Sequence, residues 1–329
     1  MLLSYVPHGY AAVVAPREPG ASAFSVFGDF QVTTPVSLEC LRAAGRIAAD
    51  ARREGEALVV AGARVRDVCA AVEDAILRRG GGLAFPVQSS RNAIAAHYCP
   101  SPEDETVYAD GDLAKLDVGV HVEGWVVDTA VTVNVGGRAS SQPLIDAARA
   151  ALDAAIAEAA PGRAVRRLSA VIEATIRGRG FHPVRSLCGH GVGRWIVHCP
   201  PPIPNSPDDS SDRLEAGMVV AIEPFATDGA GRVLERGTPE VFRADGAPSS
   251  VPGGDPGVLA AIAEFNGLPF ARRQLAGFDR GRVEETLRAL AAARKLAAYP
   301  PLVDADGRRI AQAEHTVYVG IEGVEVLTG

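Results

Sequence analysis

The stretch KLDVGVHVEGWVVDTAV, residues 115–131, constrains the fold of this chain more than any other feature. Its alternation of polar and apolar residues predicts two antiparallel strands joined by a tight turn at Glu123-Gly124. Each strand carries one aspartate, Asp117 and Asp128, although aspartate is a poor strand former. An acid near the middle of each arm of so apolar a hairpin therefore needs an explanation.

The expected turn also decides which residues of the two strands face one another. It places Asp117 opposite Ala130 and Asp128 opposite Gly119, so both aspartates lie on one face as diagonal neighbours. A loop of odd length would place them on opposite faces. Two readings of this face stay open. It is an ordinary half-exposed strand surface, or it holds a divalent cation that removes the repulsion between the two carboxylates.

Composition excludes several classes of protein. The 329 residues are 47% hydrophobic and 22% charged, so the chain can bury a large core. The net charge is -7 and no dense basic cluster is interleaved with aromatics, so neither nucleic acid nor a membrane surface is an expected partner. No apolar run reaches about 18 residues. The five cysteines form no CxxC motif, which indicates reduced thiols in a cytoplasmic protein.

The remaining patterns outline the organisation of the chain. Helices are expected to begin near Thr34-Pro35 and to span about 65–79, 143–160 and 164–178, and a buried strand is expected at 217–225. The stretch FPVQSSRNAIAAHYCP, residues 85–100, is expected to be mostly loop. The predicted domains are an N-terminal extension (1–33), a main domain (34–239 and 301–329) and an inserted helical subdomain (240–300).

Three further residues stand in unusual places. Glu223 ends the apolar run MVVAIE, and a carboxylate there needs a partner, either an arginine or a metal ion. Glu314 opens the last strands in AQAEHTVYVG, as a surface residue or as a ligand. His190 lies between glycines in CGHGVGRWIVHC, where the backbone can approach a ligand closely. By itself each of these residues leaves both readings open.

Together these residues form a coherent donor set. It contains four carboxylates, one imidazole and no thiolate: Asp117, Asp128, His190, Glu223 and Glu314. Such a set suits two divalent ions such as Mn, Fe or Co better than a closed structural zinc site. Two metals a few Å apart can share a hydroxide and clamp a scissile carbonyl.

With these motifs in view, the chain resembles the methionine aminopeptidases of type 2, in their archaeal form. The similar stretches are FPVQSSRNAIAAHYCP, AKLDVGVHVEGWVVDTAVTV, GHGVGRWIVHCPPPIPN, AIEPFATDGAGRV and YPPLVDADGRRIAQAEHT, which occur in the family's order over residues 34–329. The resemblance implies an α+β pita-bread fold, with two pseudo-symmetric αβ halves around a curved antiparallel sheet. It also implies that residues 240–300 are the helical insertion of type 2.

The resemblance further implies a role for each residue. Asp117 holds one metal, Asp128 and Glu314 bridge both, and His190 and Glu223 complete the other. The ions are two divalent metals per chain, drawn from Co, Mn, Fe(II) or Zn. A bridging hydroxide attacks the scissile carbonyl, with Glu223 as proton shuttle. The other implied residues are His97 and His198 over the substrate, and Phe85, Val197 and Tyr299 around the methionine side chain.

The expected activity is removal of the N-terminal methionine from nascent proteins, preferentially before a small second residue. The ribosome is a further candidate partner, and a monomer is expected. One alternative is an Xaa-Pro aminopeptidase or dipeptidase of the same clan, and another is a non-catalytic ribosome-binding relative. The chain departs from the family pattern at Cys99, where threonine is usual, and in having no histidine between His198 and His315.

Overall fold

A computed structural model describes residues 34–246 and 250–329, so the predicted extension at 1–33 lies outside the described residues. The first part of the described chain is a pair of helices followed by strands. Thr34 caps the first helix, because its hydroxyl accepts a hydrogen bond from the Ser37 N–H at 3.2 Å, and Pro35 opens the helix as expected. The elements are α1 (Pro35–Leu58), α2 (Val65–Arg78), β1 (Gly82–Leu83), β2 (Gln88–Arg91), β3 (Ile94–Ala96), β4 (Leu113–Val122) and β5 (Trp125–Asn134).

The next part of the chain repeats this order. A second helix pair is joined by a turn as short as the first and is again followed by strands. The elements are the 3-10 turn η1 (Val135–Gly137), α3 (Gln142–Glu158), α4 (Val165–Gly178), β6 (His182–Pro183), β7 (Cys188–Gly193) and β8 (Ile196–Pro204). The repetition produces two αβ halves, as the resemblance implies.

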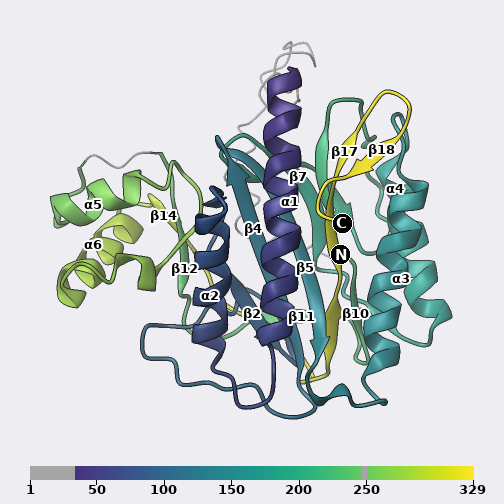
Figure 1. Ribbon diagram of the computed structural model, residues 1–329, viewed down its shortest axis with the longest axis horizontal. Helices are drawn as coiled ribbons and strands as arrows, with labels where there is room; N and C mark the ends of the chain where they lie inside the picture. Colours follow the sequence, from purple (N-terminus) through teal and green to yellow (C-terminus); the bar gives the residue numbers. More distant parts are fainter. Residues whose placement is uncertain (1–33, 247–249) are drawn as a thin grey trace.

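One large sheet joins the two halves. Its hydrogen-bonded order is β1-β4-β5-β17-β9-β7-β8, with β2 added to β4 and β18 added to β17. Figure 1 shows α1 crossing β4 and β5, while α3 and α4 lie over the other half of the sheet. The remaining strands outside the segment 240–300 are β9 (Val219–Ile222), β10 (Phe225–Thr227), β11 (Val233–Glu235), β15 (Leu302–Asp304), β16 (Ile310–Gln312), β17 (Glu314–Val319) and β18 (Val324–Val326).

The stretch 85–100 is more ordered than the sequence suggests. It forms β2, which pairs with β4 from Gln88 opposite Asp117 to Arg91 opposite Ala114, and β3, which pairs with β15. Nine of its sixteen residues lie outside strands, so the segment is mostly looped as expected, but the two strands were not anticipated. Both strands are short and find partners distant in the chain, so local periodicity carries little signal for them.

The segment from β12 to β14 builds a small unit beside α2 (Figure 1). Two helices pack on a three-stranded sheet of order β13-β12-β14, around a separate hydrophobic cluster that includes Phe242, Phe270 and Leu287. The sheet was not anticipated, and the domain boundaries themselves stay a prediction. The elements are β12 (Val241–Ala244), α5 (Pro256–Ala263), β13 (Phe270–Ala271), η2 (Arg272–Leu275), α6 (Arg280–Ala292) and β14 (Leu296–Tyr299).

Candidate metal centre and adjoining cavity

The hairpin of β4 and β5 has the register expected from its sequence. Asp117 lies opposite Ala130, and Gly119 lies opposite Asp128. The turn consists of Glu123 and Gly124, both with positive φ, at 52° and 85°. A two-residue hairpin turn with positive φ at both residues has a twist that matches the twist of the flanking strands. The two aspartates therefore share one face, as predicted.

Cross-strand pairing extends this face over the centre of the sheet. Asp117 is opposite Ala130, and Ala130 is opposite Glu314 of β17. The register of β17 on β9 pairs His315 with Ile222, which makes the adjacent residues Glu314 and Glu223 neighbours. Directly opposed residues share a face, so three of the predicted ligands lie along one row.

A second row supplies the other two ligands. Thr316 of β17 is opposite Ala221 of β9, and Ala221 is opposite His190 of β7. On its other side Thr316 holds Asp128, because the Asp128 N–H donates to Thr316 Oγ1 and this hydroxyl donates to the Asp128 carbonyl, both at 2.7 Å. The pairing of five strands from both halves therefore brings all five predicted ligands together.

The side chains meet at short distances. His190 Nε2 lies 3.7 Å from Asp128 Oδ2 and 3.6 Å from Glu223 Oε1. One donor atom each from Asp128, His190 and Glu314 lie within 4.8 Å of one another, close enough to hold one ion. His190 Nδ1 contacts the Gly191 carbonyl at 3.2 Å, which leaves Nε2 as the nitrogen facing the carboxylates.

Burial makes ionisation of these carboxylates unfavourable. It raises the pKa of Asp117 to about 7. It also raises the pKa of Asp128, Glu223 and Glu314 well above the ordinary value, and neighbouring carboxylates add to each shift. For His190, burial lowers the pKa to about 4, so its imidazole is neutral near pH 7. A neutral imidazole beside carboxylates is the form that binds a metal.

The donor atoms fit divalent metal ions. Within the part of the chain that the structure describes, Asp117 Oδ1, Asp128 Oδ1 and Glu314 Oε1 are buried without a hydrogen-bond partner. Buried polar atoms without partners are costly, and three converging carboxylate oxygens form an acceptor-only set. A cation is the partner that such a set lacks.

The simpler interpretations of these residues are wrong. The face is not a wet strand surface, because Asp128 is 5% exposed and Glu314 is 1% exposed. Glu223 has no arginine partner among residues 34–246 and 250–329; its ion-pair contact is with His190. Even Lys115, which looked like an exposed strand residue, is 1% exposed.

Gln312 is a site residue that sequence reasoning missed. Its Nε2 donates to Glu314 Oε2 at 3.2 Å and to Glu223 Oε2 at 3.5 Å. The available signal was its spacing from Glu314, because residues two apart in extended chain face the same side. Gln312 therefore orients one oxygen of each of two carboxylates, and leaves the other oxygen of each for a different partner.

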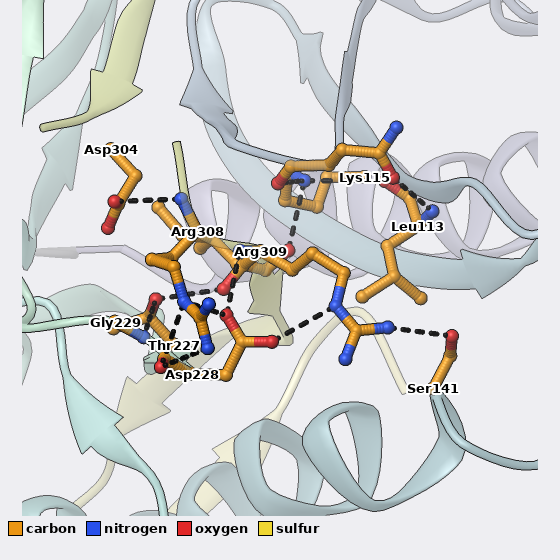
Figure 2. A network of polar contacts seen from close by, with 11 residues as sticks. Leu113, Lys115, Ser141, Thr227, Asp228, Gly229, Asp304, Arg308 and Arg309 are labelled. Carbon is orange, nitrogen blue, oxygen red and sulfur yellow. Dashed lines mark hydrogen bonds and ion pairs between the residues drawn. The ribbon is translucent and has the colours of Figure 1, made fainter. Parts of the chain in front are cut away.

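A polar network anchors the strand that carries Gln312 (Figure 2). Lys115 Nζ donates to the carbonyls of Asn92, Leu113 and Ile310, the last at 3.0 Å, and burial lowers the pKa of Lys115 to about 7. Arg309, just before β16, donates to the Asp228 carboxylate at 3.0 Å and to Ser141 Oγ at 3.1 Å. These bonds tie β16 to β4, β10 and the start of α3.

A cavity of about 390 Å³ opens beside the carboxylates. All the residues expected to contact substrate line it: Phe85, His97, Val197, His198 and Tyr299. The ring centroids of His97 and Tyr299 lie 5.7 Å apart in an edge contact, and those of His190 and His198 lie 4.3 Å apart. Tyr299 comes from β14, so the small unit built by β12 to β14 contributes to the wall.

The histidines of the cavity are neutral near pH 7. Burial lowers the pKa of His97 to about 4. Burial also lowers the pKa of His198 well below its ordinary value, and the nearby His190 adds to the shift. A neutral imidazole can donate one hydrogen bond without carrying charge, which suits it to contact a carbonyl oxygen.

The apolar wall depends on one glycine. A Cβ at Gly119 would lie 2.2 Å from the Phe85 ring, so the absence of a side chain lets Phe85 pack over β4 beside Asp128. Phe85 and Val197 are each 5% exposed. Cys99 does not line this cavity; it is buried against Val241 and Tyr299.

Comparison with known proteins agrees with this geometry. Residues 39–258 match the model of metallopeptidase family M24. A methionine aminopeptidase of Methanothermobacter thermautotrophicus is 40% identical over 294 residues, covering 88% of this chain and 98% of that protein. The crystal structure of a Thermotoga maritima methionine aminopeptidase has a TM-score of 0.68 at 26% identity, covering 91% and 99% of the two chains. A thermophilic Arx1 shares the fold, with a TM-score of 0.79 at 17% identity over 90% and 91% of the chains.

Proposed function

This chain belongs to metallopeptidase family M24, and we propose how its buried carboxylate centre performs the reaction of a methionine aminopeptidase. The relatives and the M24 match confirm the fold class and the activity expected from the sequence. The enzyme uses divalent metal to remove N-terminal methionine from polypeptides. The observation that supports a role for this centre is the convergence of five predicted ligands on one sheet face, with three carboxylate oxygens unpartnered among the described residues.

The proposed site takes two divalent ions. Asp117 would hold one ion, Asp128 and Glu314 would serve as ligands of both, and His190 and Glu223 would complete the other. The position of His190 Nε2 between Asp128 and Glu223 supports this division. Carboxylate-rich sites accept several metals, so Co, Mn, Fe(II) and Zn are all candidates and the supply of metal decides among them.

Each residue then has a defined task. Bound divalent ions supply Lewis-acid polarisation of the scissile carbonyl and activation of a water as nucleophile. Glu223 would accept the proton from that water and deliver it to the leaving amine. His97 and His198 donate hydrogen bonds to the peptide and to the developing oxyanion.

The methionine side chain is placed against the apolar wall of the cavity. Phe85, Val197 and Tyr299 provide apolar and aromatic surface there. A thioether gains from contact with aromatic rings, at roughly 0.3–1.5 kcal/mol per contact. None of these three residues carries a charged group that could bind a polar side chain, so the wall favours methionine.

The alternatives are less well supported. An Xaa-Pro aminopeptidase or dipeptidase would have a similar ligand set, but the methionine aminopeptidase relative matches over nearly its whole length. A non-catalytic relative would not need a complete set of buried ligands.

The described residues include no helix long and apolar enough to cross a membrane. A cytoplasmic location, a monomeric state and contact with the ribosome stay predictions.

The peptide Met-Ala-Ser tests the activity directly. Protein stripped with chelator and resupplied with Mn, Co, Fe(II) or Zn singly is expected to release free methionine from it. An otherwise identical peptide with a bulky second residue should react more slowly, and Ala-Pro-Ser should stay intact. Metal-dependent cleavage of Ala-Pro-Ser would instead support the Xaa-Pro alternative. A folded protein inactive with every metal would contradict the assignment.

His198 tests the substrate side of the site. We expect His198→Ala to lower kcat by about 10²–10³-fold with an unchanged metal content, because it removes one donor to the oxyanion and no ligand. His182→Ala is the control, since His182 is exposed and lies outside the cavity. Kinetics equal to those of the unmodified enzyme would exclude His198 from the site.

A further inference from the structure

A second, smaller cavity lies on the opposite face of the same sheet. Its volume is about 120 Å³, and it is bounded by α1, α3, β5, β16 and β17. Three basic side chains line it, Arg52 from α1, Arg149 from α3 and His315 from β17, together with one acid, Asp153. Figure 1 shows α1 and α3 on this face of the sheet, with the C-terminus between them.

Arg52 is partly buried here without an ionic partner. Its Nη2 donates to the Thr328 carbonyl at 3.3 Å. Its Nε is buried and has no hydrogen-bond partner in the described part of the chain. Burial lowers the pKa of the Arg52 guanidinium, and the nearby Arg149 contributes in the same direction. A buried donor of a charged group is costly when it has no acceptor. The Arg52 Nε–H therefore calls for an acceptor that the described residues do not supply.

The charge around the cavity is unbalanced. Among residues 34–246 and 250–329, neither Arg52 nor Arg149 forms an ion pair, although Glu56 favours the charged form of Arg52 from a distance. Asp153 lines the cavity as well, but it too has no ion pair with either arginine among those residues. The cavity therefore combines two positive charges, one negative charge and one unused donor.

His315 adds an imidazole ring to the cavity wall. The Thr316 N–H donates to Thr328 Oγ1 at 3.1 Å, and the same hydroxyl lies 3.0 Å from His315 Nδ1. These contacts fix the position of the ring beside Arg52.

We propose that this cavity binds one small tetrahedral oxyanion, phosphate or sulfate, between the guanidinium groups of Arg52 and Arg149. Planar guanidinium groups match oxyanion geometry and can donate two parallel hydrogen bonds. The volume equals roughly four waters, at about 30 Å³ for each, which accommodates one such ion. The cavity adjoins the proposed metal centre through Gln312, which lines it and donates to the carboxylates of Glu223 and Glu314.

The position of the cavity gives the anion a structural consequence. It lies behind β17, the strand whose front face carries Glu314 and whose Thr316 holds the backbone of Asp128. An anion there joins α1, α3 and β17 by hydrogen bonds. Occupancy therefore stabilises the folded protein, and unfolding reports binding without reference to catalysis.

The test is thermal unfolding of the full-length protein in sodium phosphate or sodium sulfate, against sodium chloride at equal ionic strength. The melting temperature of the wild type is expected to rise with phosphate in a saturable manner. Arg149→Gln and Arg52→Gln should each raise the half-saturating concentration at least about tenfold, because each removes a charged donor. Arg53→Gln, the next residue on α1, is exposed and should respond as the wild type does.

Two further arms separate this site from other anion sites. Asp128→Asn, which alters the metal centre, should keep the phosphate response; loss of the response there would place the anion at the metal ions. Acetate should act far more weakly, and an equal response would indicate a carboxylate site instead. Arg149 is exposed, so its variant is expected to fold, and an unchanged response in Arg149→Gln would overturn the proposal.

Discussion

Replacing Asp128 by asparagine is expected to lower kcat/KM by at least about 10³-fold while the protein stays folded. In the proposed site Asp128 contacts both ions, so the amide weakens two metal contacts at once. Lewis-acid stabilisation of a transition state contributes several kcal/mol, and each 1.36 kcal/mol is tenfold in rate. Glu314→Gln should have a similar effect, because Glu314 is the other proposed bridge.

Thermal stability distinguishes this loss of kcat/KM from a loss caused by misfolding. The pKa of Asp128 is raised by burial and by the neighbouring carboxylates Glu314 and Asp117. Removing one charge from such a cluster relieves repulsion, so the metal-free variant should unfold at the same temperature as the wild type or above it. A cavity effect is not expected, since asparagine and aspartate have nearly the same volume.

The measurement combines steady-state kinetics with metal content and thermal unfolding. Asp110→Asn is the matched control, because Asp110 is exposed and pairs with Arg138 on the surface. It should leave all three quantities unchanged. An Asp128→Asn enzyme that keeps wild-type kcat/KM would show that Asp128 is not a bridging ligand.

Removing the metal with a chelator is expected to abolish activity and to make stability fall as pH rises from 6.5 to 8. The cause is the buried carboxylate cluster. Burial raises the folded-state pKa of Asp117 to about 7, and those of Asp128, Glu223 and Glu314 are raised in the same direction. Without metal, these groups must ionise against burial and one another as pH increases.

The direction follows from proton binding in the two states. The metal-free folded protein holds more protons on these carboxylates than the unfolded chain does, so their contribution is full below pH 4 and is lost as pH rises through 7. His190 and His97, with folded pKa values of about 4, act oppositely, mainly between pH 4 and 7. Above pH 6.5 the carboxylates dominate, and Asp117 alone contributes about 1 kcal/mol between pH 6.5 and 8.

Urea unfolding at pH 6.5 and pH 8, with and without chelator, measures this effect. Bound metal replaces the protons, so the metal-loaded protein should lack the loss of stability. The free-energy difference between loaded and stripped protein should therefore widen with pH, and a metal at a thousandfold excess over its Kd adds about 4 kcal/mol. A stripped protein as stable at pH 8 as at pH 6.5 would mean that the carboxylates ionise normally.

The hairpin shows which part of the site is determined by the local sequence. Strand alternation and a turn at Glu123-Gly124 determine the register, and the register alone decides that Asp117 and Asp128 share a face. No distant part of the chain takes part in that decision. Unusual sequence contexts singled out the other three ligands, and the resemblance then implied a role for each. The structure places these residues with the two aspartates; their roles stay a prediction.

Other site residues depended on contacts between distant segments. Gln312 has an ordinary sequence context, and only the pairing of β17 with β9 brings its amide to both Glu314 and Glu223. Lys115 looked like a solvated strand residue, yet carbonyls from three separate segments enclose its ammonium. The short strands β2 and β3 likewise exist because β4 and β15 pair with them.

The sequence by itself determined the properties that a few neighbouring residues can settle: helix starts, the hairpin register and the types of donor atom present. Tertiary structure decided which donors are desolvated and which lie within reach of one another. It brought Asp117 and His190 to one face from opposite halves of the chain, and Arg52 and Arg149 together behind that face. The physical reason is that periodicity and turn geometry are short-range, whereas burial and charge proximity depend on the order of strands in the sheet.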